Sequence, residues 1–285
     1  MGGGTWTTAS YRSYTTTKCM SVTAEGMICG DYSAQEMFKQ RKIAPELNPK
    51  NVMRECRDSD EHPNTVPVIL SLDVTGSMGM SAVEVAKKLN IVMTSLYEKM
   101  SDVEFMIMAI GDLAYDEAPI QISQFESDIR IAEQLDKVYF EGGGGGNSYE
   151  SYTAAWYMGS RHCDLDCWKR GQNGTIITMG DEPLNPYLPQ NILNHVTGDS
   201  VQSDIETADL YKEASQKYDI YHLIVNHSWR TEQQSYMLPM QKSYRDYLDE
   251  NHVRVVTVDD ITNAIVDIVS NRSQTISTPS NEISW

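Results

Sequence analysis

Apolar residues occur along the chain in short continuous runs, separated by stretches with a helical spacing. The runs predict strands that are buried on both faces of a sheet, at 66–74, 103–110, 175–179, 221–225 and 253–258, with a shorter edge strand at 120–125. Between the runs, apolar residues recur every three or four positions, which predicts helices at 82–96, 129–135, 152–156, 207–217, 231–248 and 261–268. This alternation predicts a Rossmann-like α/β fold, with a mostly parallel central sheet and helices on both of its faces.

The first 65 residues lack this alternation. They are rich in Tyr, Ser and Thr, contain three prolines, and predict one short helix around 33–40. We therefore expect residues 1–65 to form an irregular N-terminal extension that wraps the core, with disorder as the alternative. The α/β domain is expected over 66–271, followed by a polar C-terminal tail at 272–285.

The charge and the hydropathy of the chain limit its partners. The net charge is −17, from 23 basic and 40 acidic residues, which argues against nucleic-acid binding and suits a cation or a partner with a basic surface. No apolar stretch approaches the roughly 18 residues that span a bilayer, so no membrane association is expected. The N-terminus lacks the pattern of a secretory signal, and a cytoplasmic location is therefore predicted.

Five cysteines in a protein without an export signal predict free thiols. The segment from His162 through Cys163 to Cys167 offers an alternative interpretation. On a helix, the two thiols would share one face with a histidine nearby, as in a soft-metal site. No fourth ligand lies close in the sequence, so buried thiols are the favoured interpretation.

Oxygen-bearing side chains follow three of the predicted strands. Because the carboxyl ends of parallel strands meet at one edge of a sheet, these side chains are expected to lie close together. Hard oxygen donors favour Mg²⁺, or else Mn²⁺ or Ca²⁺. The alternative is that Asp73-Val74-Thr75-Gly76-Ser77 only begins a helix, because Asp, Ser and Thr are favoured there. The candidate ligands are Asp73, Thr75, Ser77, Glu150 and Asp181, with Asn147, Ser148 and Asp112 as secondary candidates.

Asp73, Thr75 and Ser77 resemble the first loop, D-x-[ST]-x-S, of the metal-ion-dependent adhesion site (MIDAS) of von Willebrand factor A (vWA) domains. The second loop, which follows the glycine run 142–146, is similar to that of the integrin beta subunit branch, and this implies Glu150 as its ligand. The third loop departs from the usual T-D-G, because Asp181 comes later than that aspartate. The resemblance implies a vWA fold in which Thr75 and Ser77 bind the ion directly and one or both of the aspartates act through water.

The resemblance further implies protein–protein binding that depends on a divalent cation, with an Asp or Glu of the partner completing the metal shell. Free-standing vWA proteins of bacteria and their phages often work beside a MoxR-type AAA+ ATPase, which is therefore an expected partner. Two alternatives stay open. One is a structural role in a phage particle or an intracellular complex, and the other is metal-dependent hydrolysis in which Asp181 and Glu182 act as acid and base. No nucleotide-binding or hydrolase motif is present, so the protein is not expected to be an enzyme.

Overall fold

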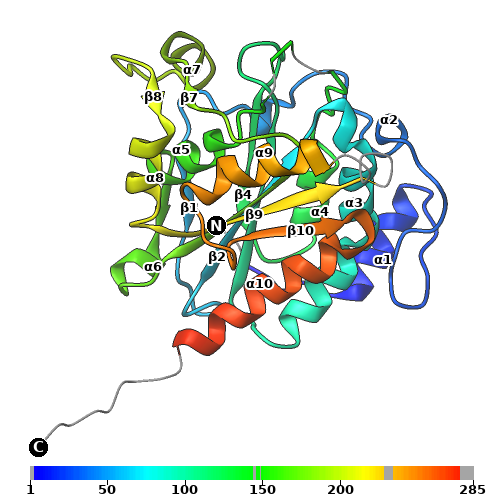
Figure 1. The fold of residues 1–285 in the computed structure, drawn as a ribbon. Helices are drawn as coiled ribbons and strands as arrows, with labels where there is room; N and C mark the ends of the chain where they lie inside the picture. Colours follow the sequence, from blue (N-terminus) through cyan, green and yellow to red (C-terminus); the bar gives the residue numbers. More distant parts are fainter. Residues whose placement is uncertain (1–2, 144–145, 148, 228–233, 277–285) are drawn as a thin grey trace, which may run out of the picture.

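The computed structural model describes residues 3–143, 146–147, 149–227 and 234–276, although not the side chains of 234–236 and 272–276. A six-stranded sheet in the order β10–β9–β6–β2–β3–β4 runs through the centre (Figure 1). Its strands are β2 (Val66–Asp73), β3 (Val103–Ile110), β4 (Ile120–Glu126), β6 (Gly174–Gly180), β9 (Tyr218–Asn226) and β10 (Val253–Thr257). All neighbouring pairs are parallel except β3 with the edge strand β4. The predicted fold class, α/β with a mostly parallel sheet, is confirmed.

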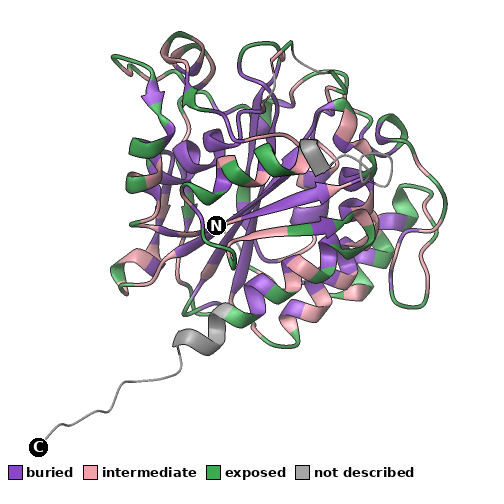
Figure 2. Cartoon of the chain, viewed as in Figure 1, coloured by how far each residue is buried: buried purple, intermediate pink, exposed green. Residues whose placement is uncertain are grey.

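Helices cover both faces of the sheet, as the sequence predicts. One apolar core contains α3 (Gly79–Tyr97), α4 (Arg130–Leu135) and α10 (Ile261–Ile276), which pack on Val68, Leu70 and Leu72 of β2. The other core contains α5 (Thr153–Arg161), α7 (Gln190–Thr197), α8 (Thr207–Ala214) and α9 (Gln234–Arg245), which pack on alternate strand residues such as Ile69. The central strands β2, β3 and β6 are therefore buried on both sides, which explains their continuous apolar runs (Figure 2). The edge strand β10 differs from the prediction, because only Val256 in it is buried and Val255 is 46% exposed.

The N-terminal extension contains short elements that pack against the α/β domain. They are α1 (Thr8–Thr17), α2 (Ala34–Met37), the 3-10 turn η1 (Pro45–Leu47) and β1 (Arg54–Cys56). Trp6 and Tyr11 belong to the same apolar core as α3. The Arg54 guanidinium donates hydrogen bonds to the carbonyl oxygens of Glu46 and Ile122, at 2.8 and 2.9 Å, so the extension also reaches the edge strand β4. Among the described residues, no helix is both long and apolar enough to cross a bilayer.

The smaller elements are η2 (Gly76–Met78), β5 (Cys163–Leu165), α6 (Asp166–Lys169), β7 (Tyr187–Leu188), β8 (Ile205–Glu206) and η3 (Val258–Asp260). The alternative prediction, that Cys163 and Cys167 share one face of a helix, is wrong. Cys163 lies in β5, which pairs with β1, and Cys167 lies in the following α6. No disulfide joins any of the five cysteines, all of which lie in the described part of the chain, as the sequence predicts. The start of the helix predicted at 231–248 falls outside the described residues, and α9 contains Pro239 in its interior.

Candidate metal centre

The first loop begins where β2 ends, and its aspartate is tied down by three hydrogen bonds. The backbone N–H and the hydroxyl of Thr75 both donate to Asp73 Oδ1, at 2.8 and 2.5 Å. The phenol of Tyr152, which precedes α5, donates to Asp73 Oδ2 at 2.6 Å. Asp73 is only 1% exposed, and its burial, with a further contribution from the charge of Asp181, raises its pKa to about 7.

The third loop follows β6 and meets the first loop through Asp181, which is completely buried. The Ser77 hydroxyl donates a hydrogen bond to Asp181 Oδ1 at 2.9 Å. His227, at the end of β9, places its Nε2 atom 3.4 Å from Asp181 Oδ2. The three segments therefore converge at the carboxyl edge of the sheet, where ligands bind in open α/β sheets.

The glycine run joins the second loop to the first by backbone hydrogen bonds. Gly76 N–H donates to the carbonyl of Gly143 at 2.7 Å, and Gly142 N–H donates to that of Val74 at 3.1 Å. Gly142 has φ of +67°, a conformation that glycine adopts without strain. These two bonds hold the second loop beside the first.

Glu150 lies at the end of the second loop, where it forms a backbone bridge with Leu184. Its side chain is 5% exposed, and Oε2 has no hydrogen-bond partner among the described residues. Burial raises the pKa of Glu150 to about 9, with further contributions from the negative charges of Asp73 and Asp112. The carboxyl group of Glu150 is thus buried in a region of strongly negative potential.

The secondary candidates differ in their surroundings. Asp112 closes a turn, because its Oδ1 accepts a hydrogen bond from Ala114 N–H at 2.8 Å. Its Oδ2 is buried without a hydrogen-bond partner in the described part of the chain, so Asp112 also adds charge beside Glu150. Asn147 is half-buried and lies beside Tyr149. Ser148 lies outside the described residues.

The chemistry of these donors fits a hard divalent cation. Each of the two hydroxyls donates its hydrogen to a carboxylate, so the oxygen lone pairs of Thr75 and Ser77 stay available to a cation. The buried Glu150 Oε2 offers a further oxygen. No group of three or more His, Cys, Asp or Glu side chains positioned to hold a metal ion by themselves occurs in the described ranges. A metal centre at this edge would therefore depend on the two hydroxyls.

Sequence reasoning missed Tyr152 and His227 as members of this site. Tyr152 carries no motif, and only its hydrogen bond to Asp73 reveals its role. Gly180, the last residue of β6, is the one sequence feature that relates to this role of Tyr152. A Cβ atom on Gly180 would lie 2.0 Å from Tyr152 Oη, so glycine is required for the phenol to reach Asp73.

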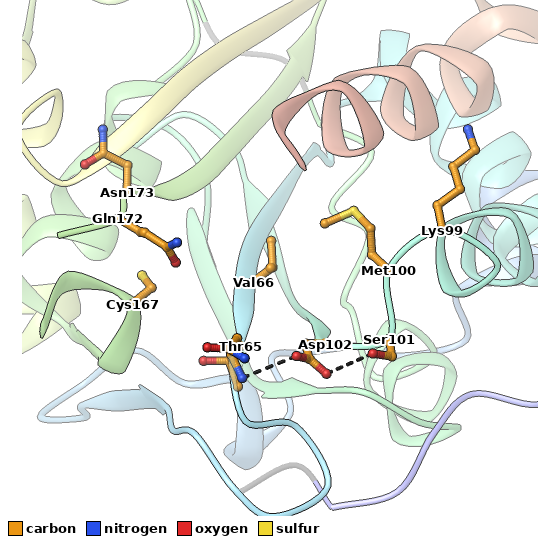
Figure 3. A pocket seen from close by; sticks show the side chains of 10 residues that line it. Thr65, Val66, Lys99, Met100, Ser101, Asp102, Cys167, Gln172 and Asn173 are labelled. Atoms are coloured by element: carbon orange, nitrogen blue, oxygen red, sulfur yellow. Dashed lines mark hydrogen bonds between the residues drawn. The ribbon is translucent and has the colours of Figure 1, made fainter. Parts of the chain in front are cut away.

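A cavity of about 420 Å³ lies at the opposite, amino edge of the sheet (Figure 3). Val66 at the start of β2, the 99–102 turn and Gln172 contribute to its lining. Asp102 in its wall accepts hydrogen bonds from Ser101 Oγ, at 3.0 Å, and from the backbone N–H of Asn64, at 3.3 Å. The cavity and the candidate metal centre are therefore separate features at opposite ends of the strands.

No protein-family model matches the sequence, and no curated protein matches it either. Solved structures with a similar fold include the pilus adhesin SpaC of Lactobacillus rhamnosus GG in its open conformation, at 14% identity over 80% of this chain with a TM-score of 0.48. They also include the vWF domain of the type V pili tip protein Mfa5 of Porphyromonas gingivalis, at 13% identity over 77% of this chain and 98% of that chain with a TM-score of 0.45. Proximal thread matrix protein 1 of the mussel byssus matches at 10% identity over 73% of this chain and 48% of that chain, with a TM-score of 0.44.

The chain spans 31% of the SpaC chain that it matches. At these identities and scores the likeness concerns the fold alone. The strand order β10–β9–β6–β2–β3–β4 with its antiparallel edge strand establishes by itself the α/β fold with a mostly parallel sheet that the sequence predicts.

Proposed function

We propose that the protein binds another protein through a divalent cation, Mg²⁺ or else Mn²⁺ or Ca²⁺. Asp73, Thr75, Ser77, Glu150 and Asp181 would hold the ion, with the two hydroxyls bound directly and one or both of the aspartates acting through water. When bound, the ion would supply a Lewis-acidic position for a carboxylate of the partner. An Asp or Glu side chain of that partner would then complete the metal shell.

The buried carboxyl group of Glu150 carries this proposal. Burying a charged group without a partner is costly, and like charges nearby increase that cost. The negative charges of Asp73 and Asp112 contribute to the raised pKa of Glu150, and its Oε2 lacks a hydrogen-bond partner in the described part of the chain. A divalent cation would offset this cost and would draw the three loops together.

Exposed apolar side chains near this edge support a protein as the partner. Met80 begins α3 next to the first loop and is 63% exposed, and Tyr115 follows the Asp112 turn and is 59% exposed. Tyr115 Oη lies 3.3 Å from the position that a Cβ on Gly146 would take, which brings it beside the second loop. Exposed aromatic and methionine side chains are enriched in the centres of protein interfaces.

The proposal is one of binding and not of turnover. The hydrogen bonds from Thr75 and Tyr152 fix the Asp73 carboxylate, and Ser77 fixes one oxygen of Asp181. General acid–base catalysis instead needs a group within reach of the substrate proton. Turnover of phosphoesters or carboxylic esters that disappears in Asp181→Asn would contradict this part of the proposal.

Titration calorimetry of the full chain with Mg²⁺ tests the metal centre. We expect wild type to bind one ion and Asp181→Ala to lose up to about a hundredfold in affinity, the upper end of the loss seen when a group that holds a metal ligand or its water is removed. Glu104→Gln is the matched control, because Glu104 is also a buried carboxyl group but lies at the other end of the sheet. Equal affinities of wild type and Asp181→Ala would refute the assigned centre.

Capture of partners from the native host, with Mg²⁺ and again with EDTA, tests the function itself. A partner retained only with Mg²⁺ by wild type, and lost by Asp73→Ala, supports the proposal. The identity of that partner decides between a MoxR-type AAA+ ATPase and a subunit of a larger assembly. Stoichiometric incorporation into a particle that persists in Asp73→Ala with EDTA would support the structural role instead.

A further inference from the structure

The segment 33–40 of the N-terminal extension lies against two of the three metal-site loops. Its helix α2 is fixed by a capping box, in which Glu36 N–H donates to Ser33 Oγ at 3.3 Å and Ser33 N–H donates to Glu36 Oε2 at 2.8 Å. Ala34, Met37 and Phe38 are buried, and α2 packs against α3. A helix of only four residues would not be stable alone, so its packing must hold it in place.

Ala34 contacts the beginning of α3, directly after the first loop. A Cβ atom on Gly79 would lie 3.3 Å from the Cβ of Ala34 and 3.6 Å from the ring of Phe140. Gly79 follows η2, which contains Ser77. The lack of a side chain at Gly79 thus allows the extension and residue 140 to pack closely against the helix that carries the first loop.

Phe38 and Gln35 contact the segment that leads into the second loop. The rings of Phe38 and Phe140 stack with their centroids 5.9 Å apart and their planes 18° apart. Gln35 Nε2 lies 3.2 Å from the position that a Cβ on Gly142 would take. Phe140 and Gly142 flank Glu141, and the glycine run that follows is bonded to the first loop.

We propose that residues 33–40 are a positioning segment that holds the first and second loops of the metal site against each other. The expected consequence, tighter metal binding, rests on the proposed function. The contact between the two loops can be tested without metal. The segment touches none of the candidate ligands in the contacts described above. It acts through Phe140 and Gly142 and through Gly79, and it stabilises the loop–loop bonds made by Gly76 and Gly142.

The first test measures Mg²⁺ affinity of the full chain by titration calorimetry in Phe38→Ala and the milder Phe38→Leu. We expect Phe38→Ala to lower the affinity roughly tenfold, at the lower end of the loss seen when a group that orients a metal ligand is removed. Trp6→Leu is the control, because Trp6 is also a buried aromatic residue of the extension but is bonded to Asn90, far along α3 from Gly79. We expect the control to stay within about twofold of wild type.

The second test measures hydrogen exchange of the Gly76 and Gly142 amides in the absence of metal. Both amides should exchange faster in Phe38→Ala and in Phe38→Leu than in Trp6→Leu, relative to the amide of Ile107 in β3, which donates to Ser123 Oγ at 2.8 Å. If wild type binds no Mg²⁺, the proposed function fails and this measurement alone decides the positioning role. Unchanged exchange at Gly76 and Gly142 in both Phe38 variants would overturn the inference.

Discussion

The two ends of the central sheet both bury carboxyl groups, but they stabilise them differently. At the amino end, Glu104 of β3 is 1% exposed and accepts a hydrogen bond from the Cys56 thiol at 3.2 Å. Burial raises the pKa of Glu104 to about 7, opposed by the hydrogen bond from Cys56 and by the charge of His62. At the carboxyl end, Asp73, Glu150 and Asp181 come from three loops; the charge of Asp181 contributes to the raised pKa of Asp73, and the charge of Asp73 contributes to the raised pKa of Glu150.

This contrast distinguishes a carboxyl group that is neutralised by a proton from carboxyl groups that, in our proposal, are neutralised by a cation. A proton taken up near neutral pH is enough to neutralise Glu104, whose Oε2 accepts the hydrogen bond from Cys56 and whose Oε1 has no hydrogen-bond partner in the described part of the chain. Protonation at the carboxyl end would leave the hydroxyls of Thr75 and Ser77 unexplained, because both converge on the carboxylates from the same loop. Burial and a proton therefore account for the amino end, whereas the hydroxyls and carboxylates that meet at the carboxyl end are the kind of donors that the proposed cation site requires.

The largest expected effect comes from adding a methyl group at either end of β6. A Cβ on Gly180 would lie 2.0 Å from Tyr152 Oη, and a Cβ on Gly174 would lie 2.5 Å from the ring of Tyr218. We expect Gly180→Ala and Gly174→Ala each to lower the free energy of unfolding by about 3 kcal/mol, as measured by urea denaturation. Only Gly180→Ala should also weaken Mg²⁺ binding, because it displaces the phenol from Asp73. Equal Mg²⁺ affinities in the two variants would show that the contact between Tyr152 and Asp73 does not matter for metal binding.

The next effect is stabilisation by the ion itself. A ligand that binds only the folded state at a hundred times its Kd raises the free energy of unfolding by about 2.7 kcal/mol. For a protein of this size we expect Mg²⁺ to raise the melting temperature by roughly 5–10 °C. Glu104→Gln should keep this increase and Glu150→Gln should lose most of it, which thermal denaturation with Mg²⁺ and with EDTA would reveal. An increase that survives in Glu150→Gln would argue against Glu150 as a ligand.

Much of the fold follows from the sequence, because strands buried on both faces leave a continuous apolar signal. The run at 103–110 predicts β3 with its observed ends, and the edge position of β4 also agrees. The extension was harder to predict, because α1 consists largely of Ser, Thr and Tyr and begins with a Thr7 cap. Its stability comes from tertiary contacts of Trp6 and Tyr11, which no local pattern reveals.

Only part of the candidate site can be predicted from the sequence. The spacing of Asp73, Thr75 and Ser77 places them in one loop, and the strand order brings Asp181 to the same edge. Tyr152 was not expected there, because a contact between residues 79 positions apart depends on how α5 packs on the sheet. The assignment of the ligands and of the ion stays a prediction that the titrations above would test.

A smaller effect is the pH dependence of stability that comes from Glu104 at the amino end of the sheet. The pKa of Glu104 is about 7 in the folded state, whereas an ordinary glutamate has a pKa of 4.5, so the folded state binds more protons between these values. Stability from this group is therefore complete below about pH 4.5 and is lost as the pH rises through about 7. We expect wild type to lose about 2 kcal/mol over this range relative to Glu104→Gln, measured by urea denaturation at about pH 5 and about pH 8. The same pH dependence in both proteins would contradict this account of Glu104.

The smallest effect compares two hydroxyl–carboxylate bonds that lie beyond the two ends of β2. Ser77 donates to Asp181 at 2.9 Å, and Thr65 donates to Asp58 Oδ1 at 2.8 Å. Without metal, Ser77→Ala and Thr65→Val should each lower the free energy of unfolding by about 1 kcal/mol, the usual net contribution of one hydrogen bond. With saturating Mg²⁺ the cost of Ser77→Ala should grow, because its oxygen would then also hold the ion, whereas the cost of Thr65→Val should not change. Urea denaturation of both variants with Mg²⁺ and with EDTA measures this, and a cost of Ser77→Ala that is independent of Mg²⁺ would exclude its hydroxyl from the metal shell.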